Sequence, residues 1–354
     1  MQKTRDYGLD ILRVLACYLV IQVHTGEFYY IGDGGTVLSG NSPFWVGILN
    51  SLCRVSVPLF VMISGYLLLP VKEEMGTFFK KRFTRVAIPF IVWCVLYAIY
   101  WAFKGQTDWA QAGINILHIP VNFGTEVGHL WYVYMLMGLY LFAPIISPWI
   151  ANASRKNMEF YLTLWVVTLC IPYIHLVFPQ ILGECYWNHT PLLYYFSGFL
   201  GYLILGAYIK KYMPEKKAWY MPVGLLMIVV GYAITAGGFI SLLDSTDVSE
   251  LELTWGFETI NVAMMGIGVF LLLKNFRLSN PASVVAARIT DISKMSYGIY
   301  LVHIMVLNFF YKILNPIIDP IQIKIPIIAI CTFIVSYLIV KLLSLLPKSK
   351  YIVG

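Results

Sequence analysis

The first apolar stretch of the chain, DYGLDILRVLACYLVIQVHTGEF (residues 6–28), carries two side chains that could do chemistry, Arg13 and His24. Because they are eleven positions apart, they lie near the same face of a helix, separated by about 16 Å along its axis. Ionisable groups are costly inside a membrane and usually mark function there. An imidazole can serve as a general base or a nucleophile, and a guanidinium can stabilise negative charge.

Two carboxylates flank this pair. Glu27 follows His24 by three residues and could orient its ring or raise its basicity, and Asp10 could pair with Arg13 from one turn below. The spacing equally allows a structural polar network that fixes helix packing, or an Arg13 side chain that reaches toward lipid headgroups.

A further buried cation, Arg54, lies well inside the next apolar stretch, at a depth comparable to that of His24. Two cations and an imidazole favour a cavity for anionic or polar groups. The alternative is an ion pair between Arg54 and a carboxylate such as Glu27 or Glu258. Pro58 in the same stretch predicts a kink.

The segment KKRFTRVAIPF (residues 80–90) places Lys81, Arg82 and Arg85 on one helical turn at the start of the third apolar stretch. Arginine binds phosphates bidentately, so a nucleotide-bearing cofactor could dock there. Basic clusters beside a membrane more commonly set topology and contact anionic lipid, and this segment alone does not separate the two.

Aromatic and histidine side chains recur near the ends of two later stretches. His129, Trp131 and Tyr132 begin one, where such rings form an interfacial belt or line a sugar-binding mouth. Tyr300 and His303 lie one turn apart in another, close enough for a buried hydrogen bond.

The elements that must position these residues are membrane helices. The 354 residues are 59% hydrophobic and only 12% charged, with a mean hydropathy of +0.73. Apolar runs of about 20 residues, enough to cross the hydrocarbon as helices, recur along the chain. We therefore predict an all-α polytopic bundle of about ten spans in a single domain, residues 1–354. The predicted spans are 8–27, 44–69, 84–104, 128–149, 159–178, 191–209, 219–240, 254–273, 295–314 and 322–346.

The net charge of +7 is explained by topology rather than by a nucleic-acid partner, because cytoplasmic loops retain Lys and Arg. Alternate loops carry nearly all the basic residues and the opposite loops carry mostly acidic ones, which predicts that both termini are cytoplasmic. The segment 105–127 is rich in Gly and Pro, so we expect no continuous helix there. The six cysteines form no C-x-x-C pair, and we expect no metal.

Taken together, these segments resemble the acyltransferase-3 family of integral membrane acyltransferases. The most specific feature is the Arg-x10-His pattern of Arg13 and His24 in the first span. Five supporting segments occur in the family's order: VPLFVMISGYLLL (57–69), KKRFTRVAIPF (80–90), HLWYVYMLMGLYLFAPI (129–145), FSGFLGYLILGAYI (196–209) and SYGIYLVH (296–303).

The chain is most similar to small stand-alone O-acetyltransferases, such as the one that acts on enterobacterial common antigen. The resemblance implies an enzyme of the bacterial inner membrane that transfers an acyl group, usually acetyl from cytoplasmic acetyl-CoA, to a hydroxyl of a cell-envelope glycan or lipid-linked saccharide. It implies roles for Arg13 and His24 in the transfer and for Arg82 and Arg85 in binding CoA phosphates. Lys81 stands where the family often has another arginine, which puts a bidentate role there in doubt.

We expect His24 to act as a general base on the acceptor hydroxyl or as a transient acyl carrier, with Arg54 or Arg13 stabilising the oxyanion. The sequence leaves open a transporter or flippase for a lipid-linked glycan or small polar solute, and a membrane subunit that only recruits an enzyme. It also leaves open whether the donor carries acetyl or succinyl, which acceptor is used, and whether the protein forms a homo-oligomer. Membrane lipid is an expected partner.

Overall fold

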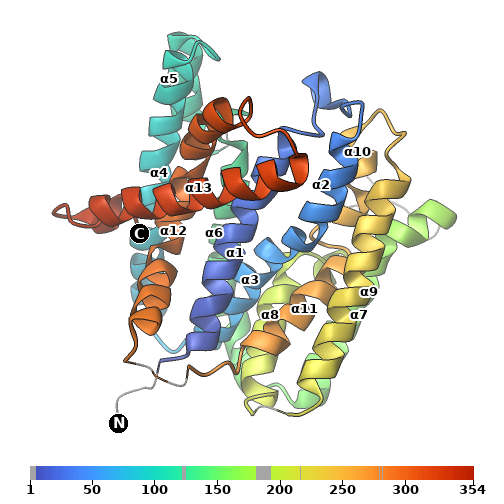
Figure 1. Ribbon diagram of the computed structural model, residues 1–354. Coiled ribbons are helices and arrows are strands. Elements are labelled where there is room, and N and C mark those ends of the chain that lie inside the picture. Colours follow the sequence, from blue (N-terminus) through green and yellow to red (C-terminus); the bar gives the residue numbers. More distant parts are fainter. Residues whose placement is uncertain (1–4, 122–124, 181–192, 216, 279, 281) are drawn as a thin grey trace.

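The computed structural model describes residues 5–354, except 122–124, 181–192, 216, 279 and 281. These residues form helices joined by short turns, with no β-strand beyond two isolated bridges, so the all-α prediction is confirmed (Figure 1). The α-helices are α1 (Tyr7–Glu27), α2 (Ser42–Asn50), α3 (Ser56–Leu68), α4 (Met75–Phe103), α5 (Trp109–His118), α6 (Trp131–Asn152), α7 (Arg155–Val177), α8 (Phe199–Tyr212), α9 (Tyr220–Ser241), α10 (Val248–Leu251), α11 (Ile260–Leu273), α12 (Val284–Leu314) and α13 (Ile321–Leu343).

Nine stretches of the described chain are long and apolar enough to cross a membrane, and they coincide with nine of the ten predicted spans. The remaining predicted span, 191–209, overlaps α8, while its residues 191 and 192 lie outside the described residues. With 14 residues, α8 extends only about 21 Å, less than the roughly 30 Å of hydrocarbon. Helix α8 is therefore too short to cross alone.

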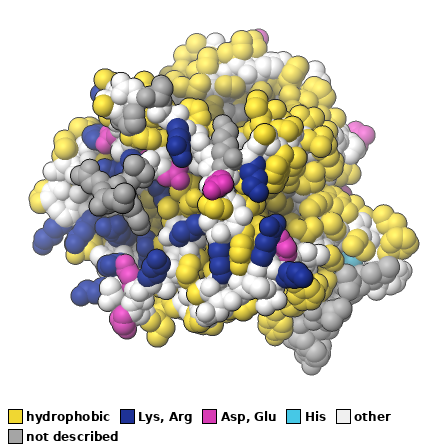
Figure 2. Space-filling view, turned by 90° about the horizontal axis from the view of Figure 1, so that it is seen from below, with side chains coloured by type: hydrophobic (Ala, Val, Ile, Leu, Met, Phe, Trp, Pro, Cys, Tyr) yellow, Lys and Arg dark blue, Asp and Glu magenta, His cyan; other side chains and the backbone are white. Residues whose placement is uncertain are grey.

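The loops predicted to share one side of the membrane do meet at one end of the bundle. The Lys210 ammonium donates to the Leu69 carbonyl at 3.1 Å, and Lys211 donates to carbonyls at the end of α6. Lys274 likewise donates to the Met213 carbonyl. Lys and Arg side chains gather on the face at which α1 begins (Figure 2). We call this the basic end of the bundle.

Glycines allow α3 and α8 to pack closely. A Cβ on Gly65 would lie 1.8 Å from the Leu203 carbonyl oxygen, and one on Gly206 would lie 2.1 Å from that of Met62. Small residues let membrane helices approach each other in this way. On the other side of α3 lies α1, which also packs against α12 and α13, and Figure 1 shows α13 running across the bundle at a steep angle to α1. Helix α1 is thus enclosed by its neighbours.

The second span is broken earlier than predicted. Helices α2 and α3 are joined by a 3₁₀ stretch, η2 (Ser51–Val55), which contains Arg54. Pro58 follows in the first turn of α3, where the missing N–H breaks no helical hydrogen bond. The break therefore precedes Pro58, and it lets the Arg54 side chain leave the helical path.

Helix α4 begins before the predicted span 84–104. Helix α4 begins at Met75, because the Glu74 carboxylate caps it by accepting from the Gly76 and Thr77 amides at 3.0 Å. The basic segment 80–85 therefore lies inside a helix. As expected, the described residues of the segment 105–127 form no continuous helix: Asp108 caps the ten-residue helix α5, which ends at His118 and packs on α4.

Candidate active site

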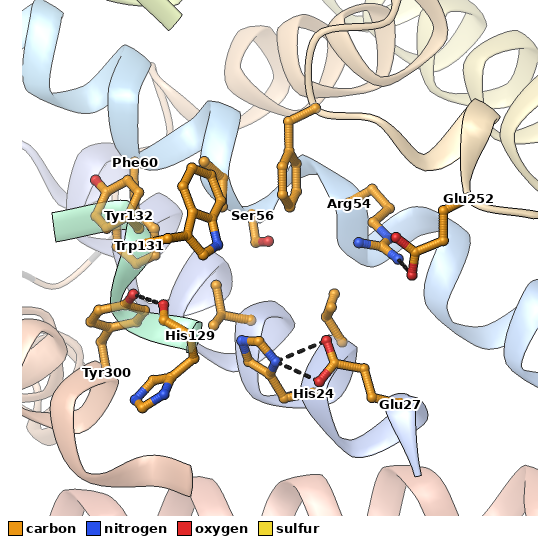
Figure 3. Close-up of a pocket in the computed structure, with 14 residues that line it drawn as sticks. His24, Glu27, Arg54, Ser56, Phe60, His129, Trp131, Tyr132, Glu252 and Tyr300 are labelled. Carbon is orange, nitrogen blue, oxygen red and sulfur yellow. Dashed lines mark hydrogen bonds and ion pairs between the residues drawn. The ribbon is translucent and has the colours of Figure 1, made fainter. Parts of the chain in front are cut away.

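Two adjoining cavities lie along the same four helices, α1, α3, α6 and α12. The first, which we call the histidine cavity, has a volume of about 240 Å³ (Figure 3). Its lining residues are Val20, Val23, His24, Glu27, Arg54, Ser56, Val57, Phe60, His129, Trp131, Tyr132, Glu252, Phe257 and Tyr300. The cavity therefore gathers most of the residues singled out in the sequence as catalytic or substrate-binding.

His24 is oriented by Glu27, as expected from their spacing. Its Nδ1 lies 3.0 and 2.9 Å from the two carboxylate oxygens. A carboxylate only accepts hydrogen bonds, so Nδ1 carries the proton and the lone pair of a neutral ring is at Nε2. Figure 3 shows the ring extending from Glu27 into the cavity. Nε2 of His24 can therefore accept a proton or attack an electrophilic carbon in the cavity.

Two more imidazoles lie beside His24. The ring of His303 is 5.3 Å from that of His24 and 5.2 Å from that of His129, measured between centroids. His303 is fully buried and its Nδ1 donates to the Tyr300 carbonyl at 2.5 Å. The Tyr300 hydroxyl donates to the His129 carbonyl (Figure 3). The expected contact between Tyr300 and His303 thus uses the backbone of Tyr300, and its hydroxyl serves to hold His129.

Arg54 is buried, and its partner differs from the carboxylates expected. Its guanidinium forms an ion pair with the Glu252 carboxylate at 3.1 Å, and the Tyr30 hydroxyl donates a hydrogen bond to the same carboxylate. The guanidinium lies 4.2 Å from the ring centroid of Trp255. Its Nε is buried and has no hydrogen-bond partner among the described residues. The ion pair with a carboxylate that the sequence allowed is therefore present, with Glu252 in place of Glu27 or Glu258, and Arg54 also lines one cavity with His24.

Aromatic rings form another side of the histidine cavity. Trp131 and Phe257 stack with centroids 5.9 Å apart and planes 29° apart. Such rings can pack against the apolar face of a sugar while polar groups beside them bind its hydroxyls.

The second cavity, which we call the arginine cavity, has a volume of about 230 Å³ and lies nearer the basic end. Its lining residues are Arg13, Phe60, Ile63, Ser64, Arg82, Arg85, Val86, Tyr132, Leu136, Tyr140, Ser296, Tyr297, Tyr300 and Gly354. The structure thus brings Arg13 together with Arg82 and Arg85. Lys81 does not line it, because its ammonium pairs with Glu73 at 2.8 Å on the surface.

Arg13 and Arg82 differ in the partners that their guanidinium groups have. Arg13 lies 3.8 Å from Asp10, as expected, but Asp10 is engaged more closely by Arg5 at 2.5 Å and by the Ser293 hydroxyl at 2.7 Å. The Nε of Arg82 is buried with no hydrogen-bond partner in the described part of the chain. Unsatisfied guanidinium donors beside a cavity fit an anionic ligand such as a phosphate.

Sequence reasoning missed several lining residues. Glu252 and Phe257 reach the histidine cavity from the segment before α11, and Phe60 and Tyr140 lie in segments that carried only the family resemblance. Glu252 lies among several acidic residues of the segment 244–258, and nothing in the sequence set it apart from them as the partner of Arg54. Within the described residues, no group of three His, Cys, Asp or Glu side chains could hold a metal ion.

Comparisons with known proteins identify the family of the chain. Glucans biosynthesis protein C from Escherichia coli strain K12 is 25% identical over 339 residues, which covers 88% of this chain and 84% of the relative. The proteins of the same description from E. coli O139:H28 and O9:H4 match over the same shares. No solved structure matches. The family model described as an acyltransferase domain matches residues 6–341, so the chain belongs to the acyltransferase-3 family and is an integral membrane acyltransferase.

Proposed function

We propose that the protein transfers an acyl group, acetyl in the simplest case, from cytoplasmic acyl-CoA to a hydroxyl of an extracytoplasmic or lipid-linked cell-envelope glycan. One observation carries the proposal: a cavity with a carboxylate-oriented imidazole adjoins a cavity lined by three arginines, inside a membrane acyltransferase. Family membership favours this enzyme over the carrier and the recruiting subunit that the sequence left open.

The donor enters from the basic end of the bundle, which faces the cytoplasm of a bacterial inner membrane by the positive-inside rule. Its nucleotide phosphates bind Arg82 and Arg85. The buried Nε of Arg82, for which the described residues offer no hydrogen-bond partner, supports this assignment. The slender arm of the donor then passes Arg13, and the thioester reaches His24.

In the transfer, His24 first accepts a proton from the acceptor and then gives it to the leaving group. His24 Nε2 takes the proton of the acceptor hydroxyl while the hydroxyl oxygen attacks the thioester carbonyl. When the tetrahedral intermediate collapses, the carbon–sulfur bond breaks, and the imidazolium returns the proton to the leaving sulfur. In the covalent variant Nε2 attacks the thioester carbonyl first, the carbon–sulfur bond breaks and CoA leaves as its thiolate. The acceptor hydroxyl then attacks the carbonyl of acyl-His24, the nitrogen–carbon bond breaks, and the hydroxyl proton passes to the CoA thiolate. Glu27 stabilises the imidazolium in the first path and the acylated ring in the second.

Arg54 is the better candidate for stabilising the oxyanion. It lines the same cavity as His24, whereas Arg13 lines the arginine cavity and is about 16 Å from His24 along α1. Its buried Nε donates to no acceptor within the part of the chain that the structure describes, and a hydrogen bond to developing charge is strongest in a buried place. The pair with Glu252 fixes the guanidinium before the reaction begins.

The acceptor sugar packs against Trp131 and Phe257 in the histidine cavity. His129, Tyr132 and Tyr300 complete its surroundings, and His303 supports them from behind. Since the relatives are described as glucans biosynthesis proteins, a glucan is the first acceptor to test.

The experiment uses purified protein in nanodiscs with radiolabelled acetyl-CoA or succinyl-CoA and a glucose oligosaccharide as acceptor probe. We expect labelled oligosaccharide and released CoA, with acetyl the better donor. His24→Ala should lower transfer by about 10²–10⁴, the usual contribution of a general base. His118→Ala, an exposed histidine on α5 outside both cavities, is the matched control. Folded protein that neither binds CoA nor releases it from either donor would refute the proposal.

A further inference from the structure

Three aromatic rings separate the two cavities. Phe60, Tyr132 and Tyr300 are the residues that line both the histidine and the arginine cavity. The ring centroids of Phe60 and Tyr132 are 6.0 Å apart, and those of Tyr132 and Tyr300 are 5.7 Å apart. The rings come from α3, α6 and α12, so they close the space between these helices. We call them the aromatic wall.

The register of α3 places this wall between the cavities. Ser56, Phe60 and Ser64 follow one another at intervals of four residues and share a helix face. Ser56 lines the histidine cavity, Ser64 lines the arginine cavity, and Phe60 lines both. A group that moves along this face of α3 from the arginines to His24 therefore passes the Phe60 ring.

The three rings are not equally fixed. Tyr132 and Tyr300 are each only 7% exposed, and the Tyr300 hydroxyl is anchored on the His129 carbonyl. Phe60 is partly exposed to the cavities, and its ring has no polar group that a movement would leave unpaired. Of the three, Phe60 can thus turn aside at the lowest cost.

We propose that the aromatic wall selects the acyl group by length and restricts transfer to short chains. The inference rests on the proposed function, in which the donor enters through the arginine cavity. The acyl group leads the thioester, so it passes the three rings before its carbonyl reaches His24. An acetyl group places one methyl beyond the carbonyl. A longer chain must pass every methylene between the rings and then share about 240 Å³ with the acceptor.

The test compares kcat/KM for acetyl-CoA, butyryl-CoA and hexanoyl-CoA, measured as CoA released with the same oligosaccharide acceptor. For the wild type we expect a steep fall with chain length. Phe60→Ala should raise the ratio of hexanoyl to acetyl by about tenfold or more, since one methylene in a fitted pocket is worth about 10- to 200-fold. Phe60→Leu, which keeps more of the volume, should raise it less and serves if the alanine variant does not fold.

Phe142→Ala is the matched control, because Phe142 is an exposed phenylalanine on α6 outside both cavities. It should leave the chain-length ratio unchanged. The inference is overturned if the wild type uses all three donors equally, if folded Phe60 variants keep the wild-type ratio, or if Phe142→Ala shifts it as much. These outcomes leave acyl transfer itself intact. Wild-type protein that releases CoA from none of the donors would instead overturn the proposed function.

Discussion

The contact between His24 and Glu27 gives a quantitative prediction. Glu27→Gln keeps the size of the side chain but removes the charge that holds the Nδ1 proton and stabilises the imidazolium. A hydrogen bond to a charged group contributes about 1.5–3 kcal/mol. The Glu27 side chain is 36% exposed, and solvent weakens the interaction, so the lower part of the range applies. About 1.5–2 kcal/mol corresponds to a loss of about 10- to 30-fold in transfer rate.

The assay is single-turnover transfer of labelled acetyl to the oligosaccharide in nanodiscs, with acetyl-CoA saturating. Glu250→Gln is the matched control, because Glu250 lies on α10, where it accepts from Ser245 and does not line either cavity. It should retain the wild-type rate.

A double mutant tests whether Glu27 acts through His24. If it does, His24→Ala with Glu27→Gln should be no slower than His24→Ala alone, because the carboxylate then has no imidazole to orient. Losses that multiply in the double mutant, or a Glu27→Gln rate equal to that of the wild type, would refute the reasoning.

Two further predictions concern the arginine cavity and the helix packing. Arg82→Ala should raise KM for acetyl-CoA about tenfold, the effect of about 1.4 kcal/mol, whereas Lys81→Ala should change it less than twofold because Lys81 pairs with Glu73 on the surface. Equal effects in steady-state kinetics would contradict the assignment of the phosphate site. Gly65→Ala should destabilise the protein by about 1–3 kcal/mol through the clash with Leu203. Gly138→Ala, whose Cβ would meet nothing within 4 Å, should leave the stability unchanged. Thermal unfolding in detergent measures both variants, and equal unfolding temperatures would contradict the packing of α3 on α8.

Local periodicity was enough to predict how α1 arranges its polar side chains. The eleven-residue spacing places Arg13 and His24 on one side of a helix, and the structure has them lining the two adjoining cavities. The three-residue spacing predicted the contact of Glu27 with His24. Such relations hold within any helix, so they need no knowledge of the fold.

Relations between distant segments could not be predicted in the same way. Arg54 finds its partner in Glu252, almost two hundred residues away, and no periodicity connects them. Lys81 and Arg82 stand four and three residues before Arg85, so both can share its helix face. Glu73, in the turn before α4, pairs with Lys81 at the surface, so that Arg82 and not Lys81 lines the arginine cavity with Arg85.

Hydropathy also predicted an earlier start for α8 than the described helix has. The apolar run 191–209 has the length of a span, yet the described helix begins only at Phe199. Just before it, Gly198 has a positive φ of 84°, and its carbonyl accepts a hydrogen bond from the Trp165 indole at 3.0 Å. Helix α8 thus begins beside the middle of α7, a place that tertiary contacts determine and that the apolar composition of the run does not reveal.

The most direct test of the account is acyl transfer across a sealed membrane. Proteoliposomes with oriented protein would hold the oligosaccharide on one side and receive acetyl-CoA only on the other. We predict labelled oligosaccharide when the donor is on the side of the basic end, and a loss of about 10²–10⁴ in His24→Ala. Transfer only when donor and acceptor share one side, or transfer that persists fully in His24→Ala, would contradict a path in which the donor reaches His24 through the arginine cavity.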